Sequence, residues 1–466
     1  MALPDLIEII PLDQPVRAEI TVPGSKSITN RALILAALAE GEVTLKGALW
    51  SEDTQIMVEC LKELGFVVNV RPDPDETCNR TITVVGQAGL VPAGGTESEP
   101  LDLFVGNAGT AARFLAPFLC LGSGVYRLHG VKRMHERPQA ALFSALRELG
   151  YRVESEHENE KLPARIFAGP AGQPPQSYTQ FERRQAAPAA PKKCRVSIEE
   201  SSQFASALML CAKVGEWQIE VVGENTDESP YIVMTDEVVK HFSNPISTYV
   251  IEPDASSASY MNGIGWLLPM ESEHVGIETH SVTVPHPIWT NQIDWRFSDY
   301  IHKFNSIRWL GDNSNSEVAI SRLNKLGDSI MTAIVLAPFS NQRVKFTDLG
   351  RLRVQECERV VALRTELTKC GAKVVEEGDT LTVYPAQPGE LHGAEIETYN
   401  DHRMAMCFAI LGLKVPGIKI KNPACVKKTF PNFFQKLAAQ PPHGLGATIL
   451  DAKSGRKLTH EELFAD

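Results

Sequence analysis

One phrase of the chain decides its fold: Met57-Val-Glu-Cys-Leu-Lys-Glu-Leu-Gly65, followed by Phe66-Val67-Val68. Apolar residues three and four positions apart predict a helix with one apolar face, and a glycine just after the last turn is a common helix end. The β-branched residues that follow predict a strand. The phrase returns at residues 141–150 before 151–153, at 360–371 before 372–375 and, in weaker form, at 297–305 before 307–309. Because the copies lie far apart, they predict an α/β (α+β) chain built by internal duplication rather than a short-period solenoid.

The chain has 466 residues, too many for one simple core, so two or three domains are expected. Strands are predicted at residues 18–22 and 101–105, each before a turn that carries glycine. Residues 170–193 are rich in Pro, Gln and Ala and predict a surface loop insertion. A domain boundary is expected near residues 243–247, after a helix that ends at His241-Phe242. The expected division is residues 23–245, residues 1–22 with 246–440, and a loosely held tail at 441–466.

Composition excludes several classes of protein. A net charge of −11 disfavours generic binding of nucleic acid, although a pocket on an acidic protein can still be locally basic. The sequence contains no run of eighteen apolar residues, so a membrane span is not predicted. The N-terminal residues also lack a basic or Arg/Ser-rich leader, and a cytoplasmic protein is therefore expected. The nine cysteines form no CxxC pair, which predicts reduced, mostly buried thiols and neither a zinc site nor disulfides: Cys60, Cys78, Cys120, Cys194, Cys211, Cys357, Cys370, Cys407 and Cys425.

The segment Val22-Pro-Gly-Ser-Lys-Ser-Ile-Thr-Asn-Arg31 indicates an anion site. A strand, a glycine turn and a helix start leave backbone N–H groups pointing at one spot, and Lys26 adds a positive charge there. An NTPase P-loop is excluded because Gly24 is separated from Lys26 by Ser25 and no glycine lies five residues earlier. A plain Ser-capped surface helix is the structural alternative.

Six further segments are modest signals taken singly. Gly106-Asn-Ala-Gly-Thr-Ala-Ala-Arg113 opens an apolar helix, and Ser201-Ser202-Gln203 precedes another, where helix capping is the commoner role of such hydroxyls. Glu356 and Arg359 are three residues apart on a predicted helix, so an ion pair is the simplest explanation. Of the others, residues 132–138 form a basic run of a kind that usually lies in a solvated loop, residues 399–403 lead into an apolar segment, and residues 427–428 place a basic pair at a turn. Gathered by folding, these positions would hold ligands with several negative charges.

Ten motifs, in order, resemble the EPSP synthase family of enolpyruvyl transferases: PGSKSITNRA, GNAGTAAR, HERP, SSQF, PYIVMT, PDASSASY, GDSIMTA, RVQECER, YNDHRMAM and KKTFP. The resemblance covers about residues 20–436. It implies two similar α/β domains, each built of three helix-and-sheet repeats, that close around a cleft. It also implies transfer of the enolpyruvyl group of phosphoenolpyruvate to the 5-hydroxyl of shikimate 3-phosphate, in a family known as the target of glyphosate. No metal, no cofactor, no nucleic-acid or membrane partner and a monomeric state are expected.

The resemblance also implies a role for each matching residue. The catalytic positions are Lys26, Asp328, Glu356 and His402, with Asp328 taking the proton of the attacking hydroxyl and Glu356 serving proton transfer at the enol methylene. The positions for phosphoenolpyruvate are Lys26, Gly109, Arg137, Gln203, Arg359, Arg403 and Lys428. The positions for shikimate 3-phosphate are Ser27, Arg31, Ser201, Ser202, Gln203, Tyr231, Asp328, Arg351 and Gln355.

Three positions on the acceptor side depart from the family pattern. Glu228 stands where a serine is usual, Gln355 where a lysine is usual and Arg351 where an asparagine is usual. We expect Glu228 to point away from the acceptor phosphate and Arg351 to supply the charge that Gln355 lacks. Three alternatives remain: a paralogue for another phosphorylated alcohol, a non-catalytic binding protein with the same fold, and the sister enzyme for UDP-N-acetylglucosamine. The sister enzyme normally carries a reactive cysteine in the loop before its Arg-Pro pair, and residues 130–138 contain none.

Overall fold

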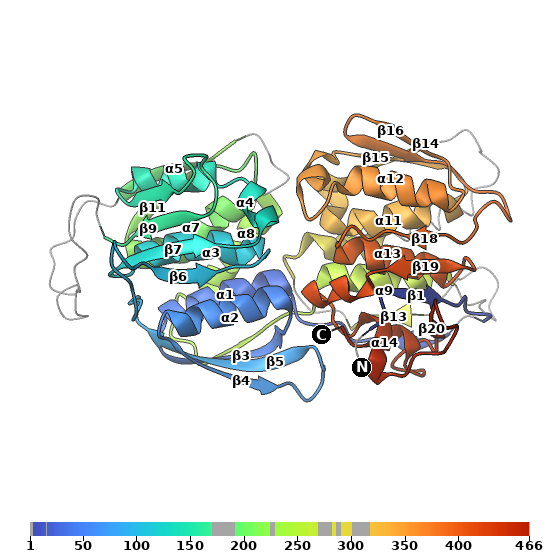
Figure 1. Ribbon diagram of the computed structural model, residues 1–466, viewed down its shortest axis with the longest axis horizontal. Helices are drawn as coiled ribbons and strands as arrows, with labels where there is room; N and C mark the ends of the chain where they lie inside the picture. The colour runs from blue at the N-terminus through green and yellow to red at the C-terminus, as the bar shows by residue number, and fades with distance from the viewer. Residues whose placement is uncertain are drawn as a thin grey trace. The chain divides into compact units, whose positions relative to one another are not determined.

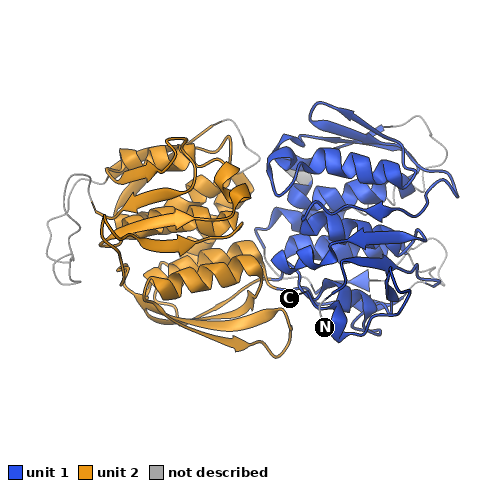
Figure 2. Cartoon of the chain, in the orientation of Figure 1, with its two compact units in different colours: residues 1–23, 253–466 blue, residues 24–252 orange. Residues whose placement is uncertain are grey.

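The computed structural model describes residues 3–14, 16–169, 192–223, 229–268, 282–285, 290–300 and 317–465. The chain divides into two compact units, unit 1 (residues 1–23 and 253–466) and unit 2 (residues 24–252), coloured separately in Figure 2. Each unit has its own hydrophobic core. Among the described residues, no helix is both long and apolar enough to cross a membrane.

Unit 2 alternates helices and short strands along its whole length (Figure 1). Its elements are α1 (Lys26–Leu38), β3 (Glu40–Leu49), α2 (Glu52–Glu63), β4 (Val67–Pro72), β5 (Asn79–Gln87), β6 (Leu101–Phe104), α3 (Gly109–Cys120), β7 (Val125–His129), α4 (Lys132–Glu136), α5 (Ala140–Glu148), β8 (Arg152–Ser155), β9 (Ala164–Phe167), β10 (Lys192–Ser197), α7 (Ser202–Gly215), β11 (Trp217–Val222), α8 (Ser229–His241) and β12 (Thr248–Val250).

Unit 1 begins with two N-terminal strands and continues after unit 2. Its strands are β1 (Leu6–Ile9), β2 (Ala18–Glu19), β13 (Val282–Thr283), β14 (Glu317–Ser321), β15 (Arg343–Thr347), β16 (Val374–Glu377), β17 (Thr380–Val383), β18 (Glu395–Ile396), β19 (Ile418–Lys421) and β20 (Ile449–Asp451). Its α-helices are α9 (Ala255–Leu267), α11 (Ile330–Leu336), α12 (Arg359–Lys369), α13 (His402–Gly412) and α14 (Phe433–Ala438). Its short helical turns are η2 (Ile293–Arg296), η3 (Arg322–Leu326), η4 (Gly327–Ser329), η5 (Ala337–Phe339), η6 (Gly350–Val354), η7 (Pro423–Lys428) and η8 (Glu461–Leu463).

The sheets share one strand pattern, as internal duplication predicts. In the described part of the chain each unit holds two four-stranded sheets and one parallel strand pair. The four-stranded sheets run β12-β3-β5-β4 and β6-β7-β9-β8 in unit 2, and β14-β15-β17-β16 and β18-β19-β1-β20 in unit 1. In each, the first two strands are parallel and the next two pairings are antiparallel. The predicted fold class, with three helix-and-sheet repeats per domain, is therefore confirmed.

The repeated phrase, a helix followed by glycine and a strand, forms the same helix end three times. Gly65, Gly150 and Gly371 follow α2, α5 and α12 with φ of 88°, 87° and 88°, a left-handed conformation that costs glycine little. In each copy the next residue donates its backbone N–H to a carbonyl five residues earlier, at 3.0 Å, which satisfies an otherwise unpaired carbonyl of the last turn. The chain then enters β4, β8 or β16.

Three helices form the interior of each unit. In unit 2, α1, α3 and α7 contact one another, and in unit 1, α9, α11 and α13 do the same. These helices are buried on nearly all sides, as expected for helices whose residues are apolar all round. Six of the ten motifs that resemble the family lie at or just before the N-termini of these helices.

Several predicted boundaries were wrong. Unit 2 extends to Glu252 rather than to residue 245, because β12 pairs with β3. The expected tail is part of unit 1, since β20 pairs with β1 and Leu463 is only 1% exposed. Lys192 and Lys193 belong to β10 rather than to a loop, and β2 and β6 end earlier than predicted, at Glu19 and Phe104. The rest of the insertion (170–191) and most of the fourth phrase (301–309) lie outside the described residues.

Candidate active site

In unit 2, the N-terminus of α1 carries Lys26. Its ammonium lies 3.0 Å from Oδ2 of Asp53, a buried residue in the first turn of α2. Asp53 therefore fixes the direction of the lysine, which keeps 18% of its side chain exposed. Ser27 follows, and its backbone carbonyl accepts a hydrogen bond from Nη1 of Arg31 at 2.9 Å.

Arg31 joins four helices of unit 2. From α1, its Nε donates to Oγ1 of Thr235 on α8 at 2.8 Å, and its Nη2 donates to Oγ of Ser206 on α7 at 3.2 Å. Its guanidinium also lies 5.1 Å from the ring centroid of Phe114 on α3. Arg31 is 2% exposed, and burial lowers its pKa to about 10, so it remains charged at neutral pH. Part of its function is therefore to hold the inner helices together.

Gly109, the first residue of α3, lies against the guanidinium of Arg137, so a side chain at this position would displace that guanidinium. A Cβ placed on Gly109 would lie 2.8 Å from both terminal nitrogens of the Arg137 guanidinium, which is less than side-chain carbons normally approach. Arg137 comes directly after the short helix α4, so the run at 132–138, expected as a loop, is partly helical. The two positions predicted for phosphoenolpyruvate in this part of the chain are thus in contact.

The start of α7 combines capping with a polar link to α3. Ser201 is the N-cap residue, and its hydroxyl accepts the backbone N–H of Gln203 at 3.2 Å, as predicted for hydroxyls at a helix start. Oε1 of Gln203 accepts from Nη1 of Arg113 at 2.5 Å. Ser202 is buried beside them, and Tyr231 lies on α8, which packs against α7.

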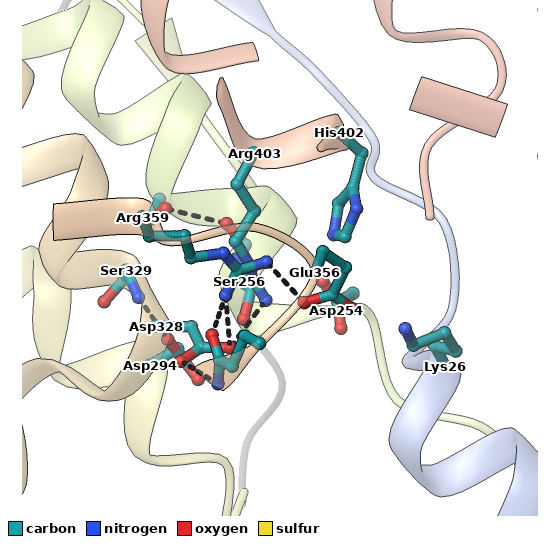
Figure 3. A network of polar contacts seen from close by, with 12 residues as sticks. Lys26, Asp254, Ser256, Asp294, Asp328, Ser329, Glu356, Arg359, His402 and Arg403 are labelled. Atoms are coloured by element: carbon teal, nitrogen blue, oxygen red, sulfur yellow. Dashed lines mark hydrogen bonds and ion pairs between the residues drawn. The ribbon is translucent and has the colours of Figure 1, made fainter. Parts of the chain in front are cut away.

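In unit 1, Asp328 lies among three arginines, of which Arg359 and Arg403 are labelled in Figure 3. Its Oδ1 is 3.1 Å from Nη2 of Arg322, and its Oδ2 is 3.6 Å from Nη1 of Arg359 and 3.5 Å from Nη2 of Arg403. Gln355 adds a hydrogen bond from Nε2 to Oδ1 at 3.4 Å. Burial raises the pKa of Asp328, but the charges of Arg403, Arg322 and Arg359 outweigh burial and hold this pKa below its ordinary value. Asp328 is therefore ionised at neutral pH.

A second carboxyl, Asp294, lies near Asp328 in a different environment. It belongs to η2, is 6% exposed, and its Oδ1 accepts the backbone N–H of Ser329 at 2.7 Å. Burial and the charge of Asp328 raise the pKa of Asp294 to about 6, although Arg403 acts in the opposite direction. Neighbouring carboxyls whose pKa values are driven apart are typical of sites that move protons.

Two arginines of this site are oriented by buried partners. Arg359, 1% exposed at the start of α12, donates from Nε to Oδ2 of Asp401 at 2.7 Å. Asp401 is the N-cap residue of α13, and its Oδ1 accepts the backbone N–H of Arg403 at 2.9 Å. Arg403 in turn lies 3.3 Å from the hydroxyl of Tyr260 on α9. His402, between them in sequence, is 2% exposed.

Glu356 lies between two cations. Its Oε2 is 2.9 Å from Nη2 of Arg359, and its Oε1 is 3.1 Å from the ammonium of Lys428, which ends η7. The predicted ion pair with Arg359 is confirmed, but the prediction that both residues share a helix was wrong. Helix α12 begins only at Arg359, so Glu356 stands on the irregular segment between η6 and α12.

The structure thus groups Asp328, Gln355, Glu356, Arg359, Arg403 and Lys428 in one unit through direct contacts. Arg351 lies on η6 and Glu228 is outside the described residues, so both expectations for them stay predictions. The sequence reasoning missed six residues that position the predicted ones: Asp53, Arg113, Tyr260, Asp294, Arg322 and Asp401. Asp401 could have been found, because an aspartate directly before an apolar helix is a typical N-cap. Nothing in the local pattern marks Asp294 or Arg322.

Comparison with known proteins decides the family. The model of the family "EPSP synthase (3-phosphoshikimate 1-carboxyvinyltransferase)" matches residues 12–437. The chain belongs to the EPSP synthase family. A 3-phosphoshikimate 1-carboxyvinyltransferase of Trichormus variabilis is 34% identical over 454 residues, which cover 93% of this chain and 98% of the relative. Its counterpart in Ralstonia nicotianae is 36% identical over 465 residues, covering 92% and 98%. The expected enolpyruvyl transferase of the shikimate pathway is confirmed.

Solved structures support the same fold. An EPSP synthase from Acinetobacter baumannii superimposes with a TM-score of 0.68 at 19% identity, covering 95% of this chain and 99% of that one. The enolpyruvyl transferase NikO from Streptomyces tendae gives 0.60 at 14% identity, covering 96% and 99%. At these identities the superpositions establish the fold alone.

Proposed function

We propose that this chain transfers the enolpyruvyl group of phosphoenolpyruvate to the 5-hydroxyl of shikimate 3-phosphate and releases phosphate. The observation that carries the proposal is the position of Asp328, an ionised carboxylate in contact with arginines that can also hold an anionic ligand. A base and anion-binding cations at one point suit a reaction in which an alcohol attacks a multiply charged partner.

The reaction needs two opposite proton movements. The hydroxyl oxygen bonds to C2 of phosphoenolpyruvate and loses its proton, while the methylene carbon gains one and becomes a methyl group. The tetrahedral intermediate then loses a methyl proton and its C–O bond to phosphate, which gives the enol ether and inorganic phosphate. Asp328 is assigned the hydroxyl proton and Glu356 the proton at the methylene carbon, and catalytic roles are also assigned to Lys26 and His402.

The cations of unit 1 support binding of the donor. Arg359, Arg403 and Lys428 are each directed by an acidic or phenolic partner, so their orientation is fixed before a ligand arrives. An anion that takes up the positive charge of Arg359 and Arg403 weakens their effect on Asp328. The pKa of Asp328 then rises, and its carboxylate becomes a better base at the stage when the hydroxyl proton must leave.

The residues of unit 2 support binding of both substrates. Lys26, Gly109, Arg137 and Gln203 are assigned to phosphoenolpyruvate, and the hydroxyls and amide at the start of α7 suit a phosphate group. Ser27, Arg31, Ser201, Ser202 and Tyr231 are assigned to the acceptor. Because Arg31 is largely engaged by Ser206 and Thr235, its contribution to the acceptor is expected to be partly structural.

A phosphate-release assay tests this function. Phosphoenolpyruvate is supplied with shikimate 3-phosphate or with UDP-N-acetylglucosamine, and turnover is expected with the first acceptor alone. Asp328→Asn should lower kcat by roughly 10²–10⁴-fold, the usual range for a general base. Asp379→Asn is a matched control, because Asp379 is 61% exposed and pairs with Arg353 outside the site. Absence of turnover with shikimate 3-phosphate would refute the proposal.

We further propose a monomeric, cytoplasmic enzyme that acts on small molecules and requires no metal or cofactor. Family resemblance supports these points. Light scattering after size-exclusion chromatography would test the monomer, and full activity after dialysis against a chelator would test independence from metals. A dimer mass, or activity that returns only on adding a divalent cation, would refute the respective point.

A further inference from the structure

The two oxygens of Asp328 face different groups of residues. Oδ2 faces Arg359 and Arg403, which are assigned to phosphoenolpyruvate. Oδ1 faces Arg322 at 3.1 Å and Gln355 at 3.4 Å. Gln355 is assigned to the acceptor, so Arg322 stands on the acceptor side of the carboxylate although no family motif of the sequence contains it.

Charge distinguishes the two residues at Oδ1. Gln355 contributes an amide where the family resemblance implies a lysine, so it brings a hydrogen bond without a positive charge. Arg322 brings the charge, with its Nη2 at 3.1 Å from Oδ1. We propose that Arg322 is a positioning residue for the acceptor, and that its guanidinium takes the place of the lysine missing at position 355.

The location of Arg322 fits this role better than that of a surface ion pair. Its side chain is 5% exposed and that of Asp328 is 15% exposed, so water screens their interaction far less than it screens a pair in solvent. Arg322 begins η3 directly after β14, and the next turn, η4, carries Asp328. The guanidinium thus helps to orient Asp328 and, together with Arg403 and Arg359, keeps ionised the base that takes the proton of the acceptor hydroxyl.

The other charged groups around Asp328 do not duplicate this position. Arg359 is shared with Asp401, Glu356 and the amide oxygen of Gln355, which accepts from its Nη1, and Arg403 approaches the opposite oxygen. Asp294 is acidic and binds the backbone of Ser329. Removing Arg322 should therefore affect the acceptor more than the donor, whereas a merely structural role would affect both substrates alike.

Steady-state kinetics of Arg322→Gln test the inference, which rests on the proposed function because it uses the assignment of Gln355 to the acceptor. Loss of a charged hydrogen bond should lower kcat/KM for shikimate 3-phosphate by roughly ten-fold or more. KM for phosphoenolpyruvate should change less than about three-fold. The double variant Arg322→Gln with Gln355→Lys should recover most of the loss, because it restores a cation next to Oδ1. Arg343→Gln is the control, since Arg343 pairs with Glu317 on the adjacent strand at 40% exposure and should behave as wild type.

Several results would overturn the inference. Unchanged acceptor kinetics in Arg322→Gln, or a double variant without recovery, would exclude the proposed exchange of cations. Loss of acceptor affinity in Arg351→Ala but not in Arg322→Gln would favour the sequence-based expectation for Arg351 instead. If Arg322→Gln does not fold, Arg322→Lys decides: a smaller, acceptor-selective loss supports the inference, and equal changes for both substrates overturn it. A wild-type chain inactive with shikimate 3-phosphate would instead refute the proposed function, and this inference with it.

Discussion

Asp294→Asn should stabilise unit 1 at alkaline pH and have little effect at acidic pH. Burial raises the pKa of Asp294 from 3.8 to about 6, so the folded chain holds the proton more tightly than the unfolded chain. For a carboxyl whose pKa is raised by folding, the favourable contribution is present at low pH and is lost as pH rises through the folded pKa. A difference of about 2 pK units corresponds to about 3 kcal/mol lost between roughly pH 4 and pH 7.

Asparagine at position 294 removes this loss without changing the shape of the side chain. Its amide oxygen can still accept the backbone N–H of Ser329, which Asp294 binds at 2.7 Å. The variant should therefore match wild type within about 1 kcal/mol at pH 4.5 and exceed it by about 3 kcal/mol at pH 8. For a unit of this size the gain corresponds to roughly 6–12 °C in Tm.

Differential scanning calorimetry at the two pH values measures the effect directly. Asp294→Ala is the companion variant, because it removes both the titrating group and the acceptor for Ser329. It should lose about 1–3 kcal/mol at pH 4.5, where the protonated wild-type carboxyl still accepts this bond. Asp379→Asn should change little at either pH, since its carboxylate is 61% exposed. An Asp294→Asn effect that is equal at pH 4.5 and pH 8 would refute the reasoning.

Three further substitutions test the site. Gly109→Ala should raise KM for phosphoenolpyruvate roughly ten-fold and leave the acceptor KM nearly unchanged, because the new Cβ displaces the Arg137 guanidinium; an unchanged donor KM in steady-state kinetics would contradict this. Glu356→Gln should lower kcat by roughly 10²–10⁴-fold and also lower Tm, because Arg359 and Lys428 each lose an ion pair, as measured by phosphate release and thermal unfolding; a kcat near wild type would exclude its proton-transfer role. Asp401→Asn should destabilise unit 1 by about 3 kcal/mol, because Arg359 then stays buried with its closest ion pair neutralised. A free energy of unfolding in urea equal to that of wild type would show that Glu356 and Asp328 alone compensate the charge of Arg359.

The repeat architecture could be predicted because it depends on local sequence. The phrase that ends at Gly65 needs an apolar helix face and one left-handed residue, and both are visible within a dozen positions. The boundary between the two units was harder to predict from the sequence. Whether residues 246–252 belong to one domain or the other depends on the pairing of β12 with β3, some two hundred residues away in sequence. The tail was misjudged for the same reason, since the partner of β20 is the N-terminal strand β1.

Most basic residues of the site were found from the sequence, with Arg113 and Arg322 as exceptions, whereas most of their acidic partners were not. Lys26 and Arg359 stand in recognisable motifs at helix starts, which makes them visible without a structure. Asp53 and Asp294 lie in ordinary segments and acquire their roles only through long-range packing, one against Lys26 and the other against the turn of Ser329. A sequence pattern indicates which side chains lie at a helix start, but it does not indicate which distant residues those side chains contact in the fold.

The acidic partners are needed because the buried arginines of the site must be compensated in charge when no ligand is bound. Arginines buried to about one per cent exposure, as Arg359 is, would be costly without a compensating charge, so the chain supplies Asp401, Glu356 and Asp328. An incoming anion competes with Glu356 and Asp328, whose side chains keep some exposure, more easily than with Asp401, which is fully buried. The Asp401 contact is therefore best suited to orient Arg359 permanently. The two more exposed contacts can yield to substrate, and both involve the carboxylates that are assigned to proton transfer. Under the proposed function, binding of the donor anion would free the two carboxylates at the moment the reaction requires them.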